Sequence, residues 1–457
     1  MGYSTAGGSS IQDKCSIIFN EPIEISIASS TISLNGIYDC SLIIFNDSKI
    51  ESLHNSDGEN HTSFFSFNTY KYAFVKDYLY IPSHKNKAYI LGKYTNGAEF
   101  QIFTGNLNFS KGKYYVYNSV DNDFNLPPME DGTGEIVSLS QHETANSYIA
   151  PLNSKCSFSA SVKGNSTTSI GMPKSATVVW ETLNTSIQPN VGDVVKNVYI
   201  ANGVIYFETT DNRGNALIAA TDEVGNILWS WHIWATDYNP NAEFDTYPGF
   251  ENLKVMNRNL GALSNRGKTD AVGMVYQWGR KEPFSGYGMV FTSEMKTITT
   301  SSKIGTEEYA TTHPTTFILA LSQGGDWRYN SNSSAWGSTK TQLDPCPPGW
   351  KVPEGGEAGL FKDFKLGVFD NENKGMIFKD INGASNIYMP AQGYLADSQS
   401  FRDGWWQVDY EGRYWTTSVS GSSSHYFSFD FEKICNQAEF THSSRANGHA
   451  IRCVEDK

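Results

Sequence analysis

Two cysteine-bearing segments near the end of the chain place the strongest constraint on its fold. In residues 344–353, Cys346 precedes Pro-Pro-Gly-Trp, and in residues 450–454 a strand-like run contains Cys453. Between them, short aromatic and β-branched runs alternate with Gly, Pro and Ser, which is typical of a loop-rich β domain. We therefore predict a surface recognition module here and not a catalytic site.

Length and composition predict the number of domains and the class of fold. A chain of 457 residues exceeds what one hydrophobic core usually fills, so about three domains are expected. Aromatic residues make up 14% of the chain and charged residues only 18%. Because this mix favours pleated strands over amphipathic helices, we predict a mainly β protein.

Charge and hydropathy exclude two classes of protein. With a net charge of −13 and no concentrated Lys/Arg surface, the chain is not expected to bind nucleic acid. No apolar stretch is long enough to span a membrane, and the polar residues 1–10 lack the apolar part of a signal peptide. We interpret this start as the place where an export signal has been removed.

Strand patterns and breaks between them predict three domains. Strand-like runs recur from Cys15 to Pro128 with turn residues between them, among them residues 23–27, 41–45, 78–81 and 114–117. This pattern predicts an antiparallel β-sandwich over residues 1–134. The Pro-, Gly- and acid-rich residues 124–134 form the boundary. A second β-sandwich is predicted over residues 135–236. It ends in a tryptophan-rich strand at residues 227–234, whose tryptophans are expected to pack at the junction with the next domain, a sugar platform being the alternative.

The third predicted domain covers residues 237–457 and is expected to be α+β. Gly and Pro become denser and strands shorter, and helical signals occur at residues 315–322 and 356–365. The six cysteines include no CxxC pair, which argues against a structural zinc site. In an exported protein, a Cys346–Cys453 bridge would close a loop of about 100 residues and contribute roughly 4–5 kcal/mol. The alternative is two reduced, buried thiols, and the pairing of Cys15, Cys40, Cys156 and Cys435 stays open.

The third domain resembles the Fibrobacter succinogenes major paralogous domain, a module of secreted bacterial surface proteins. Five segments match in order, at residues 255–261, 273–280, 346–353, 414–418 and 451–454. A Cys-Pro-Pro-Gly-Trp run before a helix, with a second Cys on the last strand, is also similar to the C-type lectin-like fold. The resemblance implies an exposed, lectin-like binding domain.

The first two domains resemble the paired, transthyretin-like β-sandwiches of Bacteroidetes fimbrillins. The matching segments lie at residues 143–149, 162–166, 190–193 and 228–234. The resemblance implies export as an outer-membrane lipoprotein, with membrane contact only through a removed anchor segment, and assembly with other pilus subunits by β-strand exchange. Because the chain ends four residues after Cys453, with no spare strand to donate, we expect a terminal subunit at the tip of a fimbria on the cell surface.

One aromatic cluster is the candidate ligand site. Apolar ring faces beside charged groups offer stacking together with hydrogen bonds, the combination that sugar rings or peptide side chains need. One of the two adjacent tryptophans is expected to face the core. The candidate residues are Arg402, Asp403, Trp405, Trp406, Asp409 and Tyr410.

Neither a metal nor a cofactor is expected. The motifs of calcium-dependent lectins are absent, and the acidic loop at residues 237–245 has Ala242 where an EF-hand requires Gly. HExxH, Gly-x-Ser-x-Gly and P-loop motifs are also absent. The formylglycine-generating enzymes have a similar scaffold but need a reactive cysteine pair. We predict a non-enzymatic adhesion protein that binds a surface glycan or protein. The alternatives are a monomeric glycan-binding lipoprotein for nutrient capture and, third, a hydrolase or transferase.

Overall fold

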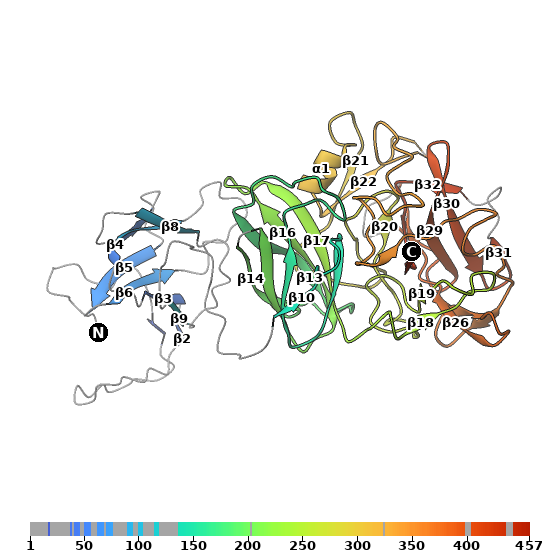
Figure 1. Cartoon of the computed structure of the whole chain (residues 1–457), viewed down its shortest axis with the longest axis horizontal. Helices are drawn as coiled ribbons and strands as arrows, with labels where there is room; N and C mark the ends of the chain where they lie inside the picture. The colour runs from blue at the N-terminus through green and yellow to red at the C-terminus, as the bar shows by residue number, and fades with distance from the viewer. Residues whose placement is uncertain are drawn as a thin grey trace. The chain divides into compact units, whose positions relative to one another are not determined.

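The computed structural model of the chain divides into two compact units, Met1–Thr133 and Gly134–Lys457 (Figure 1). The structure describes residues 136–201, 203–322, 325–397, 404–435 and 442–457, and, before residue 118, the backbone of strands β1 to β9. The division after Thr133 lies within the Pro- and Gly-rich residues 124–134. The prediction of a mainly β protein is confirmed.

The described strands of the first unit form three small sheets. Their strand orders are β1-β2, β5-β6-β3-β9 and β4-β7-β8. Most neighbours are antiparallel, as predicted, but β3 and β9 pair in parallel. The predicted strands at residues 23–27 and 78–81 lie outside the described residues. The bounds are β1 Ile17–Ile18, β2 Ile37–Tyr38, β3 Ser41–Phe45, β4 Ile50–Asn55, β5 Thr62–Phe67, β6 Tyr70–Val75, β7 Tyr89–Tyr94, β8 Glu99–Phe103 and β9 Tyr114–Tyr117.

The second unit begins with a β-sandwich of two four-stranded sheets, drawn in green in Figure 1. One sheet has the order β10-β12-β15-β14 and the other β11-β17-β16-β13. The bounds are β10 Val137–Ser138, β11 Ser147–Ala150, β12 Lys155–Ser159, β13 Ser175–Thr182, β14 Val195–Ala201, β15 Val204–Thr209, β16 Gly214–Thr221 and β17 Ile227–Ala235.

The strand order of this sandwich is that of an immunoglobulin-type Greek key. The six strands from β12 to β17 are divided between the sheets as strands B to G of that fold are, with B-E-D in one sheet and C-F-G in the other. Strand β11 then joins the second sheet parallel to β17, and β10 joins the first parallel to β12. The chain itself therefore supplies all eight strands.

Burial follows from the position of each strand between layers. In β15 every second residue is buried, as expected for a strand with one face to the core, whereas all of β16 and most of β17 are buried. Trp231 packs on Phe158 of the opposite sheet, and His232 on the other face of β17 contacts Tyr276. Trp229, Trp231 and Trp234 are all buried, so they form no exposed sugar platform. The predicted packing at the junction holds for Trp229, which contacts Lys281, and for Trp234, which contacts Tyr238, whereas Trp231 packs inside the sandwich.

The described part of residues 237–457 forms mostly short strands joined by loops, with the longer β29 and β30 as exceptions. The sheets have the orders β18-β19-β34-β23, β20-β33-β27-β28, β21-β22, β24-β25-β26 and β29-β30-β31, with β32 also on β30. The bounds are β18 Phe244–Asp245, β19 Val255–Met256, β20 Tyr276–Gln277, β21 Lys296–Thr299, α1 Glu307–Thr312, β22 Thr316–Leu319, β23 Trp350–Lys351, β24 Val368–Asp370, β25 Gly375–Lys379, β26 Ser385–Pro390, β27 Tyr394–Leu395, β28 Trp405–Trp406, β29 Glu411–Ser420, β30 Ser423–Asp430, β31 Ile434–Cys435, β32 His442–Ser444, β33 Gly448–His449 and β34 Val454–Glu455.

Both predicted helices in this region are wrong. Residues 315–322 contain strand β22, which pairs in parallel with β21, because Thr316, Phe317 and Ile318 are β-branched or aromatic. Residues 356–365 form turns, since glycines at 355, 356 and 359 weaken a helix at its start. The observed helix α1 is a single turn and a half, capped by the Thr306 side chain, which accepts from the backbone N–H of Tyr309.

The predicted bridge between Cys346 and Cys453 is confirmed, and it joins cysteines 107 positions apart in the chain. Cys453 directly precedes β34, which pairs with β19 on one side and β23 on the other. The bridge thus fixes the end of the described chain in the middle of its sheet. Cys156 is a free, buried cysteine, and burial raises the pKa of its thiol to about 12.

A buried polar network joins the sandwich to the C-terminal region. The Asn215 amide donates to the Asn184 side chain and to the Gly261 carbonyl, and its oxygen lies 2.8 Å from Nε2 of His232. Nδ1 of His232 lies 3.3 Å from the Tyr276 hydroxyl. Burial lowers the pKa of His232 to about 3, so the imidazole is neutral. Both parts also share one hydrophobic core.

Removal of the disulfide should destabilise the second unit strongly. We expect the Cys346→Ala/Cys453→Ala variant to lose about 4–5 kcal/mol of unfolding free energy, because the bridge closes a long loop in the unfolded chain. Denaturant unfolding of the full chain measures this loss, with Cys156→Ala as the control that leaves the bridge intact. An unchanged denaturant midpoint in the double variant would contradict the expectation.

Acid should destabilise the protein through His232. The unfolded chain protonates this histidine near pH 6.5, whereas the folded protein does so near pH 3. Between these values the unfolded state binds the extra proton, so the unfolding free energy should fall by up to about 1.4 kcal/mol per pH unit on acidification. The His232→Gln variant should show a flatter pH profile than the wild type, and an unchanged slope in this variant would contradict the expectation.

Candidate functional site

Four of the six predicted ligand-site residues lie in the described structure, around strand β28. Trp405 is paired with Leu395 and Trp406 with Tyr394 in the antiparallel ladder of β27 and β28. Because successive residues of a strand project to opposite faces of the sheet, the two tryptophans point to opposite faces. Arg402 and Asp403 lie outside the described residues.

The two tryptophans have different environments. Trp405 packs against a buried cluster that includes Val275 and Leu395, and Tyr287 contacts its ring edge-on at 5.9 Å. Trp406 is 45% exposed. The prediction that one of the pair faces the core is confirmed, and Trp406 is the one that a ligand can reach.

Asp409 and Tyr410 follow in a tight turn. Asp409 has a φ of 64°, in the left-handed region that non-glycine residues seldom adopt. Its carboxylate lies 2.7 Å from Nζ of Lys268. The Tyr410 ring is about half exposed and meets Phe431 edge-on at 4.9 Å. Asp409 is therefore charge-paired, whereas Tyr410 adds aromatic surface.

The structure places further groups beside Trp406 that sequence reasoning missed. The guanidinium of Arg413 lies 3.7 Å from the ring centre of Tyr394 and 5.1 Å from that of Tyr426. Nε and Nη2 of Arg413 donate to the two carboxylate oxygens of Glu411 at 2.8 and 3.0 Å. We call Trp406, Tyr394, Arg413 and Tyr426 the aromatic strip.

A buried histidine lies next to the strip. His449 stacks on Trp415 with ring centres 4.0 Å apart, and Tyr426 and Tyr394 meet it edge-on. Burial, with a smaller effect of Arg413, lowers the pKa of His449 well below its ordinary value, so the ring is neutral. Its Nδ1 atom has no hydrogen-bond partner among the described residues.

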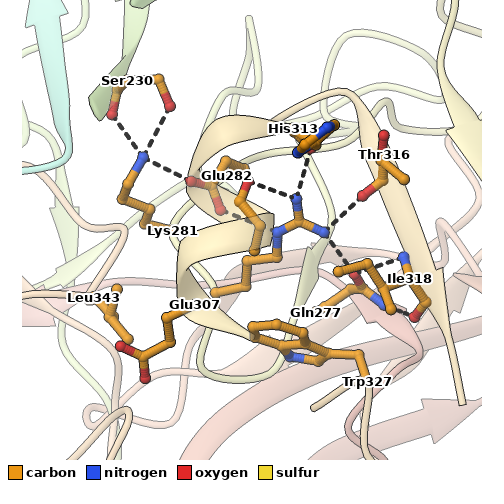
Figure 2. A network of polar contacts seen from close by, with 12 residues as sticks. Ser230, Gln277, Lys281, Glu282, Glu307, His313, Thr316, Ile318, Trp327 and Leu343 are labelled. Carbon is orange, nitrogen blue, oxygen red and sulfur yellow. Dashed lines mark hydrogen bonds and ion pairs between the residues drawn. The ribbon is translucent and has the colours of Figure 1, made fainter. Parts of the chain in front are cut away.

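A second cluster of ionisable groups lies in the interior (Figure 2). Glu282 contacts Arg280 at 3.0 Å and Lys281 at 2.7 Å, and all three side chains are at most 2% exposed. Burial alone would raise the pKa of Glu282, but Lys281 and Arg280 hold it below its ordinary value. We call these three residues the buried ion cluster.

The buried ion cluster connects separate parts of the fold. Lys281 donates to the backbone and side-chain oxygens of Ser230 on β17. Arg280 donates to Thr316 at the start of β22 and to the carbonyls of Ala310 and His313 at the end of α1. Every charge thus has partners within the protein. We conclude that the cluster is structural and that the aromatic strip is the better candidate for ligand contact.

The acidic loop at residues 237–245 uses its carboxylates in contacts with arginines. Glu243 contacts Arg258 at 3.0 Å, and Asp245 lies 3.8 Å from Arg452. Burial raises the pKa of Asp245 to about 6, although Arg452 opposes the shift. Within the part of the chain that the structure describes, no three His, Cys, Asp or Glu side chains are grouped as metal ligands.

Comparisons with known proteins give no family. No protein-family model and no curated protein matches the chain. One solved structure with a match is that of the four N-terminal immunoglobulin domains of Dscam1 isoform 7.44, with 10% sequence identity, a TM-score of 0.13 and coverage of 44% of this chain. The chain spans about half of that structure, 51%. A TM-score this low does not establish a common fold.

No helix in the described residues is long and apolar enough to cross a membrane.

Breaking the buried ion cluster should cost more stability than breaking a surface pair. Glu282→Gln leaves Arg280 and Lys281 without their counter-charge, and we expect it to lower the unfolding free energy by about 3–5 kcal/mol. Lys433→Met, which removes an exposed partner of Asp430, should change it by no more than about 0.5 kcal/mol. Chemical denaturation of both variants gives the comparison, and equal losses would show that the cluster is not a structural centre.

Proposed function

We propose that this chain is a non-enzymatic adhesion protein of the bacterial cell surface, a tip or minor subunit of a Bacteroidetes fimbria with a lectin-like C-terminal domain. In this proposal it is exported as an outer-membrane lipoprotein and joins other pilus subunits by β-strand exchange. The third domain contacts a glycan or protein on another surface. It needs no cofactor.

The exposed Trp406, on a body closed by a disulfide, is the observation that carries this proposal. Large exposed aromatic side chains are costly in water and are enriched at the centres of binding surfaces. The strand that carries Trp406 belongs to the same compact unit as the sandwich, so a force applied to the ligand acts on one body with a shared core. Such a body suits a protein that holds one surface against another.

One observation favours the alternative, a monomeric glycan-binding lipoprotein. Part of the outer edge of β13 is already covered by the chain itself, because Val290 donates to the Thr185 carbonyl and Thr292 to the Glu181 carbonyl. The open edge of β14 has a register shift at Lys196, and Asn197 there has a φ of 53°. Irregularity of this kind hinders the pairing of a further strand. These two edges of the sandwich are therefore poor sites for strand exchange.

Adhesion should depend on Trp406. Cells that display the full chain should adhere about tenfold less when it carries Trp406→Ala, because truncation of an aromatic anchor removes most of its contact area. Tyr329→Ala, at a similarly exposed tyrosine outside the strip, should adhere like wild type. Cells counted on host and bacterial surfaces, after the amount of displayed protein is equalised, provide the measurement.

The location of the protein separates the two candidate functions. Gold-labelled antibody against the chain should mark the ends of fibres if it is a tip subunit. Label spread evenly along fibres would contradict the tip assignment, and label on the cell surface in the absence of fibres would favour the monomeric lipoprotein.

A further inference from the structure

The aromatic strip is continuous across two sheets. Trp406 and Tyr394 are a cross-strand pair on β28 and β27, and Arg413 on β29 stacks on Tyr394. The strands approach closely where Gly393 bridges to Gly412. A Cβ atom at Gly393 would lie 2.3 Å from the Trp406 carbonyl, and one at Gly412 would lie 2.4 Å from the Phe429 ring. The strip therefore depends on glycine at both positions.

The polar groups of the strip are held in place before any ligand arrives. Glu411 binds Arg413 through two parallel hydrogen bonds, and Tyr394 and Tyr426 flank the guanidinium. A planar guanidinium held in this way has lost most of its side-chain freedom in the free protein. Binding therefore costs little further conformational entropy, which is the usual benefit of pre-organisation.

The ions at the strip are already paired with each other. Arg413 is neutralised by Glu411. Lys268 is neutralised by Asp409, which lies in the turn that follows Trp406. A strongly charged ligand would have to compete with these pairs for its counter-ion. A neutral ligand with hydroxyl groups would not, because a hydroxyl both donates to a carboxylate and accepts from a guanidinium.

A separate observation indicates an unfilled hydrogen-bonding position next to the strip. Nδ1 of His449 is buried and has no partner among the described residues. Such atoms are few in native structures and are usually satisfied by water or ligand. The edges of Tyr394 and Tyr426 both meet this ring. Nδ1 of His449 is therefore a buried polar atom beside Tyr394 and Tyr426 that a single water could satisfy.

We propose that the aromatic strip binds a neutral oligosaccharide of at least two sugar units. One pyranose ring stacks its C–H face on Trp406, and the next unit presents hydroxyls to Arg413 and Glu411 between the two tyrosines. This inference rests on the proposed adhesive function, for which it names the ligand class. It differs from that function in requiring a glycan, since adhesion alone could use a protein partner.

Glycan binding by the full-length protein tests the proposal. The probes are cellohexaose, xylohexaose, mannohexaose and N-acetyllactosamine as neutral glycans, polygalacturonate and sialyllactose as acidic ones, and an unstructured peptide library. We expect saturable calorimetric binding of at least one neutral glycan and no tighter binding of the acidic ones. Trp406→Ala and Arg413→Lys should each weaken it at least about tenfold. Lysine keeps the charge but loses the planar stack and the paired hydrogen bonds.

Controls make the outcome decisive. Tyr329→Ala should bind like wild type, and thermal unfolding must show that Trp406→Ala and Arg413→Lys are folded. If Arg413→Lys is not folded, Tyr394→Phe replaces it. That variant removes only a hydroxyl and should weaken glycan binding severalfold. Absence of neutral-glycan binding, preference for acidic glycans or for peptides, or full affinity in Trp406→Ala would each overturn the proposal. If Trp406-dependent adhesion of cells persists without glycan binding, the adhesive function survives and the glycan inference falls. If a neutral glycan binds through the strip but cells do not adhere, the glycan inference stands and the adhesive function falls.

Discussion

The C-terminal region depends on the position of its last strand. Strand β34 lies between β19, which comes from the start of the region, and β23, which follows Cys346. Two-residue strands supply too few ladder hydrogen bonds to be stable by themselves. The disulfide holds this pairing covalently, and the preceding β33 pairs with both β20 and β27. The position of β34 therefore also fixes β33, which pairs with β27 in the sheet that carries Trp406.

Buried arginines hydrogen-bond backbone carbonyls that neighbouring strands would satisfy in β proteins with longer strands. Loops in the interior contain backbone carbonyls that no neighbouring strand can satisfy, and leaving such groups unpaired is costly. Arginine has five donors in a fixed geometry, and it is used here repeatedly. Arg280 donates to the end of α1, Arg452 to the carbonyls of Met256 and Tyr388, and Arg445 to that of Gly421. The cost of burying each charge is offset by these bonds and by the nearby carboxylates.

Sequence reasoning succeeded where the pattern was local or covalent. Composition, strand-like runs between turn residues and the paired cysteines predicted the β class, the strands at residues 41–45 and 114–117, and the Cys346–Cys453 bridge. It failed at residues 315–322, because a short continuous run of apolar or β-branched residues has no periodicity that distinguishes a helix from a strand. Whether such a run pairs depends on β21, which is distant in the chain.

The sequence could predict only part of the candidate site, because most of its residues come from separate strands. Trp406 and Tyr410 could be picked out because they lie in one aromatic segment, and alternation along β28 already required one tryptophan to face inward. Tyr394, Arg413 and Tyr426 come from three other strands, and each is an ordinary residue in its own segment. Their grouping requires the register of β27 against β28 and of β29 against β30.

Contacts with neighbouring strands also hold the aromatic strip in shape. Arg413 reaches Tyr394 only because β29 runs beside β27 at two glycines, and Tyr426 is placed by its pairing with Trp415. Trp415 in turn donates to the Tyr276 carbonyl, and Tyr276 contacts His232 of the sandwich. The aromatic strip is therefore linked by packed and hydrogen-bonded groups to the junction of the sandwich. A change at that junction would be expected to alter ligand contact without touching the ligand, since packed interiors transmit displacement.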